Sequence, residues 1–106
     1  MGIDESLTNE IVRRILTVAR PDKIILFGSA ASSLMTSDSD IDLLVVEDHI
    51  ADRRGEYVRI RTSLRGMGYP FDIFLISTQS YQTTKDLVGG IAYPAARQGR
   101  VIYEAA

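Results

Sequence analysis

Apolar residues at helical spacing mark two helices in the first two thirds of the chain. The first covers about residues 5–19, and Pro21 ends it because proline cannot continue a helix. The second covers residues 50–66 and ends where Gly66 and Gly68 follow it. The apolar positions that predict these helices are Leu7, Ile11, Ile15 and Val18 for the first, and Tyr57, Ile60, Leu64 and Met67 for the second.

Short β-prone runs indicate three strands between and after these helices. They cover residues 24–27, 41–46 and 71–76, and each is rich in Ile, Leu, Val or Phe. A fourth run, Val101–Tyr103, is typical of a final edge strand. Continuous apolar runs of this length are expected for strands buried in the core of the domain.

The segment between the third and fourth strands predicts two short helices. One covers about residues 79–87, and Gly89 with Gly90 breaks it. The other covers residues 91–98, with Pro94 in its first turn, where proline is tolerated. The whole chain is thus expected to form an α/β (α+β) fold in the order αβ(turn)βαβαβ. A small mixed β-sheet of about four strands carries the helices packed on it.

Composition places this fold in one domain spanning residues 1–106. A chain of 106 residues with 45% hydrophobic content can bury a core of its own. The net charge of −2 predicts no broad field for nucleic acid, so we do not expect a nucleic-acid partner. The chain has no cysteine, which excludes disulfides and thiolate metal sites and fits the cytoplasm. It has no apolar run near 18 residues and no leader pattern, so we expect no membrane contact.

A Gly-Ser pair and a D-x-D motif lie at the facing ends of the first two strands. Gly28-Ser29 follows the first strand, and Asp40 stands eleven residues after Ser29, immediately before the second. Glycine lets backbone approach a ligand, and a helical turn at residues 30–34 would add free N–H groups for a phosphate. Either half alone is also typical of an ordinary turn. Together, at this spacing, they favour a site for a nucleoside triphosphate, ATP or another NTP.

The two acids of the D-x-D motif indicate a divalent metal ion. Asp40 and Asp42 share one face of a strand, roughly 6–7 Å apart at Cα. Paired carboxylates repel each other, and Mg²⁺ relieves this because it takes oxygens from one or two carboxylates and from substrate phosphates. We therefore predict Mg²⁺ as the cofactor, as two ions, with Mn²⁺ as the alternative ion. Leu44 and Val46 continue the same face, which confines the acids to the leading end of the strand.

Asp72 is the third candidate acid, near the start of the run at residues 71–76. A buried and unpaired charge is costly, so this Asp is unusual as a core residue. It fits if it stands beside Asp40 and Asp42 on a neighbouring strand, where three carboxylates can hold two metal ions. In that arrangement Asp72 takes the proton of the attacking hydroxyl. In the alternative interpretation Asp72 has only a structural role, as a cap at the start of the strand.

Taken together, these residues resemble the minimal nucleotidyltransferase (MNT) domain of the DNA polymerase β-like superfamily, in particular the MntA-like antitoxins of HEPN–MNT toxin–antitoxin pairs. The resemblance rests on Gly28-Ser29, on the run Asp38-Ser-Asp-Ile-Asp-Leu-Leu-Val45 and on Asp72, and it spans nearly the whole chain. It implies the polymerase β-like fold and transfer of a nucleoside monophosphate from an NTP to a hydroxyl. By this resemblance Gly28 and Ser29 hold phosphates, Asp40 and Asp42 hold metal ions, and Asp72 is the third carboxylate.

One departure from the family pattern bears on activity. The family commonly shows G-S-R-A-R-G at this turn, whereas Ala30 and Ser32 stand at the two arginine positions here. Arginine there would supply a planar, permanently charged phosphate clamp, so its loss predicts weaker triphosphate binding. The departure favours a slower enzyme, or a module that acts mainly by docking to its partner.

The chain leaves little surface for positioning an acceptor, so we expect another protein or a second copy to supply it. The resemblance implies a small helical HEPN-type protein, which the transferase neutralises in some pairs by adding AMP to a tyrosine. Arg54, Arg61 and Arg65 lie roughly on one face of the second helix, either as a solvated face or as a basic strip for an acidic partner. The main hypothesis is a protein adenylyltransferase. The alternatives are an inactive docking module, and transfer to a small molecule such as an aminoglycoside or to RNA.

Overall fold

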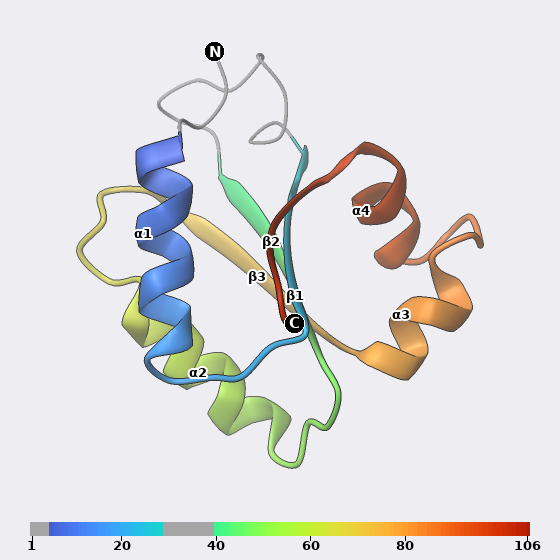
Figure 1. The fold of residues 1–106 in the computed structure, drawn as a ribbon, viewed down its shortest axis with the longest axis horizontal. Helices are drawn as coiled ribbons and strands as arrows, with labels where there is room; N and C mark the ends of the chain where they lie inside the picture. Colours follow the sequence, from blue (N-terminus) through green and yellow to red (C-terminus); the bar gives the residue numbers. More distant parts are fainter. Residues whose placement is uncertain (1–4, 29–39) are drawn as a thin grey trace.

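The structure, a computed structural model, describes residues 5–28 and 40–106 (Figure 1). Within these ranges the chain forms four helices and a four-stranded sheet. None of these helices is long and apolar enough to cross a membrane. In chain order the elements are α1 (Glu5–Leu16), β1 (Lys23–Phe27), β2 (Ile41–Glu47), α2 (Arg53–Ser63), β3 (Phe71–Ser77), α3 (Thr78–Thr84), α4 (Ala92–Gln98) and β4 (Arg100–Glu104).

The sheet is mixed and has the strand order β3-β2-β1-β4. β1 runs antiparallel to both β2 and β4, whereas β2 and β3 are parallel. Parallel neighbours need a crossover connection, and α2 supplies it between β2 and β3. The expected mixed sheet of about four strands is confirmed, and β4 lies at its edge as predicted.

Helices cover both faces of this sheet, α1 and α2 on one side and α3 and α4 on the other (Figure 1). Side chains alternate along a strand, so Leu43 and Val45 of β2 pack towards α1 and α2. Leu44 and Val46 pack on the opposite face with Tyr81 of α3. Because β2 is central and covered on both sides, its sequence is a continuous apolar run rather than an alternating one.

The helix ends differ from the sequence prediction where side chains cap them. α2 begins at Arg53, because the Asp52 carboxylate accepts a hydrogen bond from the Gly55 N–H at 3.1 Å. α3 begins one residue earlier than predicted, because the Ser77 hydroxyl caps it through the Ser80 N–H. The helices are also shorter than their apolar periodicity predicts, since residues such as Met67 pack against the core from the turn that follows α2.

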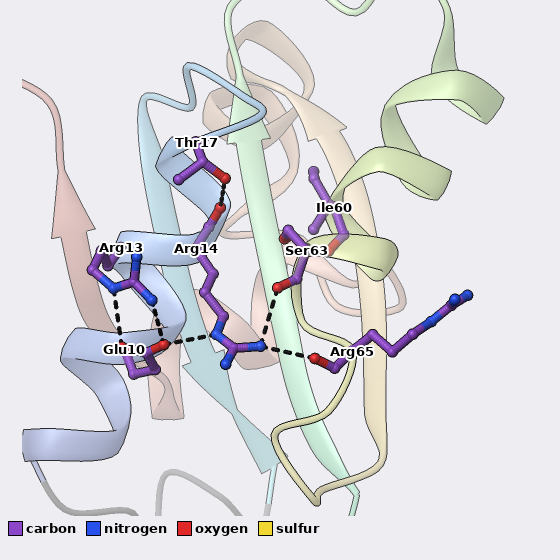
Figure 2. A network of polar contacts seen from close by, with 7 residues as sticks. All are labelled: Glu10, Arg13, Arg14, Thr17, Ile60, Ser63 and Arg65. Atoms are coloured by element: carbon purple, nitrogen blue, oxygen red, sulfur yellow. Dashed lines mark hydrogen bonds and ion pairs between the residues drawn. The ribbon is translucent and has the colours of Figure 1, made fainter.

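Arg14 joins α1 to the end of α2 (Figure 2). Its guanidinium donates to the Arg65 carbonyl at 2.8 Å and to the Ser63 carbonyl at 3.4 Å, while its Nε pairs with Glu10 at 2.7 Å. Carbonyl groups at a helix C-terminus have no partner within the helix, and a cation there satisfies them and complements the helix dipole. The side chain of Arg14 thus holds the two helices of this layer together.

We expect Arg14→Ala to lower the free energy of unfolding by about 1–2 kcal/mol, because it leaves carbonyls at the end of α2 without their charged donor. Arg13→Ala is the matched control, since Arg13 pairs with the same Glu10 but is 64% exposed and contacts no carbonyl of α2. Its effect should be clearly smaller than that of Arg14→Ala, because exposed ion pairs contribute little to stability. Urea unfolding followed by circular dichroism measures both, and equal losses would show that the interhelical hydrogen bonds do not matter.

Candidate functional site

The parallel pairing of β2 with β3 brings two of the predicted acids side by side. Asp42 is the register partner of Asp72. Both lie on the face of the sheet that α3 and α4 cover further along. Asp42 and Leu44 are two residues apart on β2 and therefore share this face. Asp40 stands just before β2, where the Ile41 N–H binds the Pro70 carbonyl at 2.8 Å and ties this end of β2 to the start of β3.

The three carboxyl groups of Asp40, Asp42 and Asp72 influence one another. The pKa of Asp40 is raised, first by hydrogen bonding to Asp72 and then by repulsion from it. The pKa of Asp42 is raised mainly by burial, and further by the negative charges of Asp72 and Asp40. No ion pair within residues 5–28 and 40–106 includes any of the three. The predicted acids therefore form a cluster of negative charge, open to solvent at Asp40 and Asp72, that favours a cation or a proton.

Gly28 lies against this cluster at the end of β1. Its φ is +68°, in the left-handed region that favours glycine. A Cβ atom built on it would overlap Oδ2 of Asp42. A glycine is therefore needed here for two reasons, the backbone conformation and the space for the carboxylate. Ser29 and the arginine-replacing positions Ala30 and Ser32 lie outside the described residues.

The oxygen donors of this cluster fit a divalent cation of the Mg²⁺ type by their chemistry. Within the described ranges, no three His, Cys, Asp or Glu side chains are gathered into a ready-made metal site. Mg²⁺ does not need one, because it is usually held by one or two carboxylates together with substrate phosphates. Asp42, Asp72 and Asp40 offer such carboxylates. Their roles as metal ligands stay predictions.

Two phenylalanines beside the acids were not predicted as site residues. The rings of Phe27 and Phe74 lie 5.8 Å apart at an interplanar angle of 53°. Phe27 is the register partner of Asp42, and Phe74 follows Asp72 by two residues on the same face. Phe74 is 37% exposed, so the acids border an apolar surface that an aromatic ring can contact. The alternation of Asp72, Phe74 and Ile76 along β3 is the sequence signal that places Phe74 here.

A second acidic pair lies at the opposite end of β2 and is separate from the candidate site. Glu47 is only 4% exposed and interacts with Glu56 of α2. Burial first, and then the hydrogen bond and repulsion of Glu56, raise the pKa of Glu47 to about 8. Its Oε2 has no hydrogen-bond partner among the described residues. The sequence prediction ended this strand at Val46 and so missed Glu47 as a buried group.

We expect Gly28→Ala to be more destabilising than Gly68→Ala. Both glycines have positive φ, which costs a residue with a side chain about 1–2 kcal/mol. Nothing lies within 4 Å of a Cβ at Gly68, whereas one at Gly28 displaces the Asp42 carboxylate. Gly28→Ala should therefore lose about 1 kcal/mol more in chemical unfolding. Equal losses would mean that the contact with Asp42 has no energetic weight.

We also expect the stability of the protein to fall between about pH 5 and pH 8 because of Glu47. Its folded-state pKa is raised, so the unfolded chain releases this proton first, and stability is lost as the pH rises through the folded pKa. The slope is at most about 1.4 kcal/mol per pH unit. Glu47→Gln should flatten this part of the profile, measured by urea unfolding across the range. The lowered pKa of Glu56 acts at more acidic pH, so parallel profiles for both proteins would refute the shift.

Comparisons with known proteins bear on the family and the fold of the chain. A sequence model of the family described as "Nucleotidyltransferase domain" matches residues 6–88. No curated protein matches the chain significantly. Similar solved structures include a toxin–antitoxin with AMP-PNP, 19% identical with a TM-score of 0.68, where the match covers 92% of this chain and 73% of that one.

Two further solved structures show the same fold. One is a double mutant of the toxin–antitoxin MntA–HpeT, 17% identical with a TM-score of 0.65, covering 97% of this chain and 75% of that one. The other is a tri-AMPylated Shewanella oneidensis HEPN toxin in complex with its MNT antitoxin, 18% identical with a TM-score of 0.62, covering 96% and 74%. At these identities the likeness establishes the fold, and it confirms the expected one. Since the family match covers most of the sequence, the chain belongs to the nucleotidyltransferase-domain family.

Proposed function

We propose that this protein transfers a nucleoside monophosphate, AMP from ATP, to a hydroxyl group of a protein partner. The observation that carries the proposal is the register of β2 and β3, which sets Asp42 beside Asp72 with Asp40 next to them. Clustered carboxylates that have no basic partner in the described parts of the chain are costly for a domain that only docks. They suit a reaction between a polyphosphate and a hydroxyl.

In the proposed reaction the acceptor oxygen forms a bond to the α-phosphorus. The bond between the α-phosphorus and the oxygen that bridges it to the β-phosphorus breaks, and that oxygen leaves with pyrophosphate. Asp72 of β3, which is more exposed than its register partner Asp42, takes the proton of the acceptor hydroxyl. Asp40 and Asp42 would hold the Mg²⁺ ions, which would neutralise phosphate charge and stabilise the departing pyrophosphate. Gly28 keeps the backbone at the end of β1 free of a side chain, which leaves room for the nucleotide next to Asp42.

The proposed partner is a small helical HEPN-type toxin, which this protein would modify in the cytoplasm as its antitoxin. Support comes from the structural neighbours, because one holds AMP-PNP and another contains an AMPylated HEPN toxin. Support also comes from size, since the described elements are largely used to build the sheet and the acid cluster. Orientation of two reactants supplies a large part of catalysis, and a bound acceptor protein brings its own surface for it.

A docking antitoxin without catalysis is the second candidate. Ala30 and Ser32 favour it, because the family places arginines at both positions. The acid cluster opposes it, since docking does not require carboxylates placed so that Asp72 raises the pKa of both Asp40 and Asp42. The two candidates separate on one question, whether a protein without the acids still neutralises its partner.

We expect Asp42→Asn to reduce transfer at least about a hundredfold while the fold stays intact. The assay incubates the protein with Mg²⁺, ATP labelled at the α-phosphate and lysate from its own source, and follows labelled protein bands. Asp48→Asn is the matched control, because Asp48 is exposed just beyond the other end of β2 and the substitution is the same. Label from the γ-phosphate must not appear, since transfer of a nucleotide releases it with pyrophosphate.

Labelling that persists in Asp42→Asn would refute the assignment of the site. A partner that is still neutralised by Asp40→Asn/Asp42→Asn would instead support the docking antitoxin. Unfolding curves of each variant exclude loss of the fold as the cause.

A further inference from the structure

A groove runs between α2 and the outer edge of β3, and the structure leaves it open. It consists of two hollows of about 560 and 640 Å³, and Tyr57 of α2 lines both. The first hollow is lined by both Ile73 and Phe74 of β3. Neighbouring residues of a strand point to opposite faces, so a hollow that both of them line opens at the edge of the sheet itself. We call this feature the α2–β3 groove.

The edge of β3 that faces this groove is unpaired. Among the described residues β3 pairs with β2 alone, along Phe71–Ser77. One side chain reaches this strand from α2, since Arg53 donates to the Leu75 carbonyl at 2.7 Å. A free strand edge offers main-chain hydrogen bonds to an extended polypeptide, which is a common mode of peptide recognition.

A basic stripe borders the groove. It consists of Arg54, Val58, Arg61 and Arg65, whose spacing of four, three and four residues places them on one side of α2 and its following turn. All four line the groove. None of the three arginines forms an ion pair within the described parts of the chain. Figure 2 shows that the Arg65 side chain points away from Arg14 and α1, although its carbonyl accepts the Arg14 hydrogen bond.

Apolar side chains accompany these charges. Val58, Tyr69 and Phe74 are 51%, 39% and 37% exposed, and each lines one of the two hollows. Exposed apolar side chains gathered with unpaired arginines are typical of a protein interface. The unpaired strand edge and this apolar lining favour a polypeptide over nucleic acid, for which the chain has no broad positive field at a net charge of −2.

We propose that the α2–β3 groove binds an acidic segment of the polypeptide that accepts the nucleotide. Unpaired arginines select for acidic side chains, and the free edge of β3 holds the main chain of the segment. The same strand carries Asp72 at its second position, so a segment that lies along β3 brings its hydroxyl towards that carboxylate. The inference rests on the proposed function for the identity of the acceptor, but binding in the groove does not depend on catalysis.

The test measures binding of a fluorescently labelled random copolymer of glutamate and tyrosine by anisotropy, without nucleotide. This probe combines a polypeptide backbone, negative charge and a hydroxyl. Arg54→Glu/Arg61→Glu should weaken binding at least about tenfold, and added salt should weaken binding to the wild type. Arg13→Glu/Arg97→Glu changes the net charge equally at two residues that line neither hollow, and should stay within about twofold of the wild type.

Three results would overturn the proposal. The first is an equal loss of copolymer affinity in the two double variants, and the second is no binding of the copolymer by the folded wild type. The third is a single-stranded RNA that binds the wild type more tightly than the copolymer does and that Arg54→Glu/Arg61→Glu no longer binds. Asp42→Asn separates binding in the groove from the proposed transfer reaction. This variant should lose transfer but bind the copolymer with the affinity of the wild type. If no transfer is found with any acceptor, the proposed function fails while the binding result still decides the groove. Melting curves of each variant show that it is folded.

Discussion

The parallel pairing of β2 with β3 is the constraint on which the candidate site depends. It aligns Asp42 with Asp72 within a run of seven register pairs that extends from Ile41 to Glu47 of β2. A shift of one residue would turn Asp72 towards α1 and α2 and turn Ile73 out of the core. Burial of a charge and exposure of an apolar side chain would both be unfavourable, so the apolar positions of β3 hold the acid in place. The core therefore fixes the geometry of the carboxylates through the strands that carry them.

The parallel pair in turn requires α2. A crossover from β2 to β3 must return the chain to the same end of the sheet, and α2 with Ile60 and Leu64 in the core does this. Arg14 then ties the end of α2 to α1. The layer that receives the crossover is thus held together by a side chain of α1. A similar dependence acts on the other neighbour of β2, where the antiparallel β1 ends in Gly28 against Asp42.

Most of the fold follows from patterns that are local in the sequence. The continuous run at 41–46 indicates a central strand because only burial on both faces removes the polar alternation. The acids were found for the same reason, since Asp40, Asp42 and Asp72 interrupt or precede apolar runs where a structural role is costly. What the sequence does not contain is the register between strands. For that reason neither the ring contact of Phe27 with Phe74 nor the burial of Glu47 against Glu56 was predicted. Helix ends were placed wrongly where a cap such as Asp52 competes with periodicity.

The two ends of β2 show how burial decides what an acidic pair does. Glu47 is almost fully buried and its neighbour Glu56 is held by Arg59, so the pair is neutralised by retaining a proton on Glu47. Asp40 and Asp72 are exposed and have no arginine or lysine partner among the described residues, so an external cation can reach them. A proton satisfies the first pair from within the fold, whereas the second remains available to a ligand. The basic residues are divided in the same way, because Arg59 forms an ion pair with Glu56, whereas Arg54, Arg61 and Arg65 form none with any residue that the structure describes. The net charge of −2 thus conceals a negative site and a positive groove on neighbouring elements, which suits the proposed binding of a cation-carrying nucleotide and an acidic acceptor at the same time.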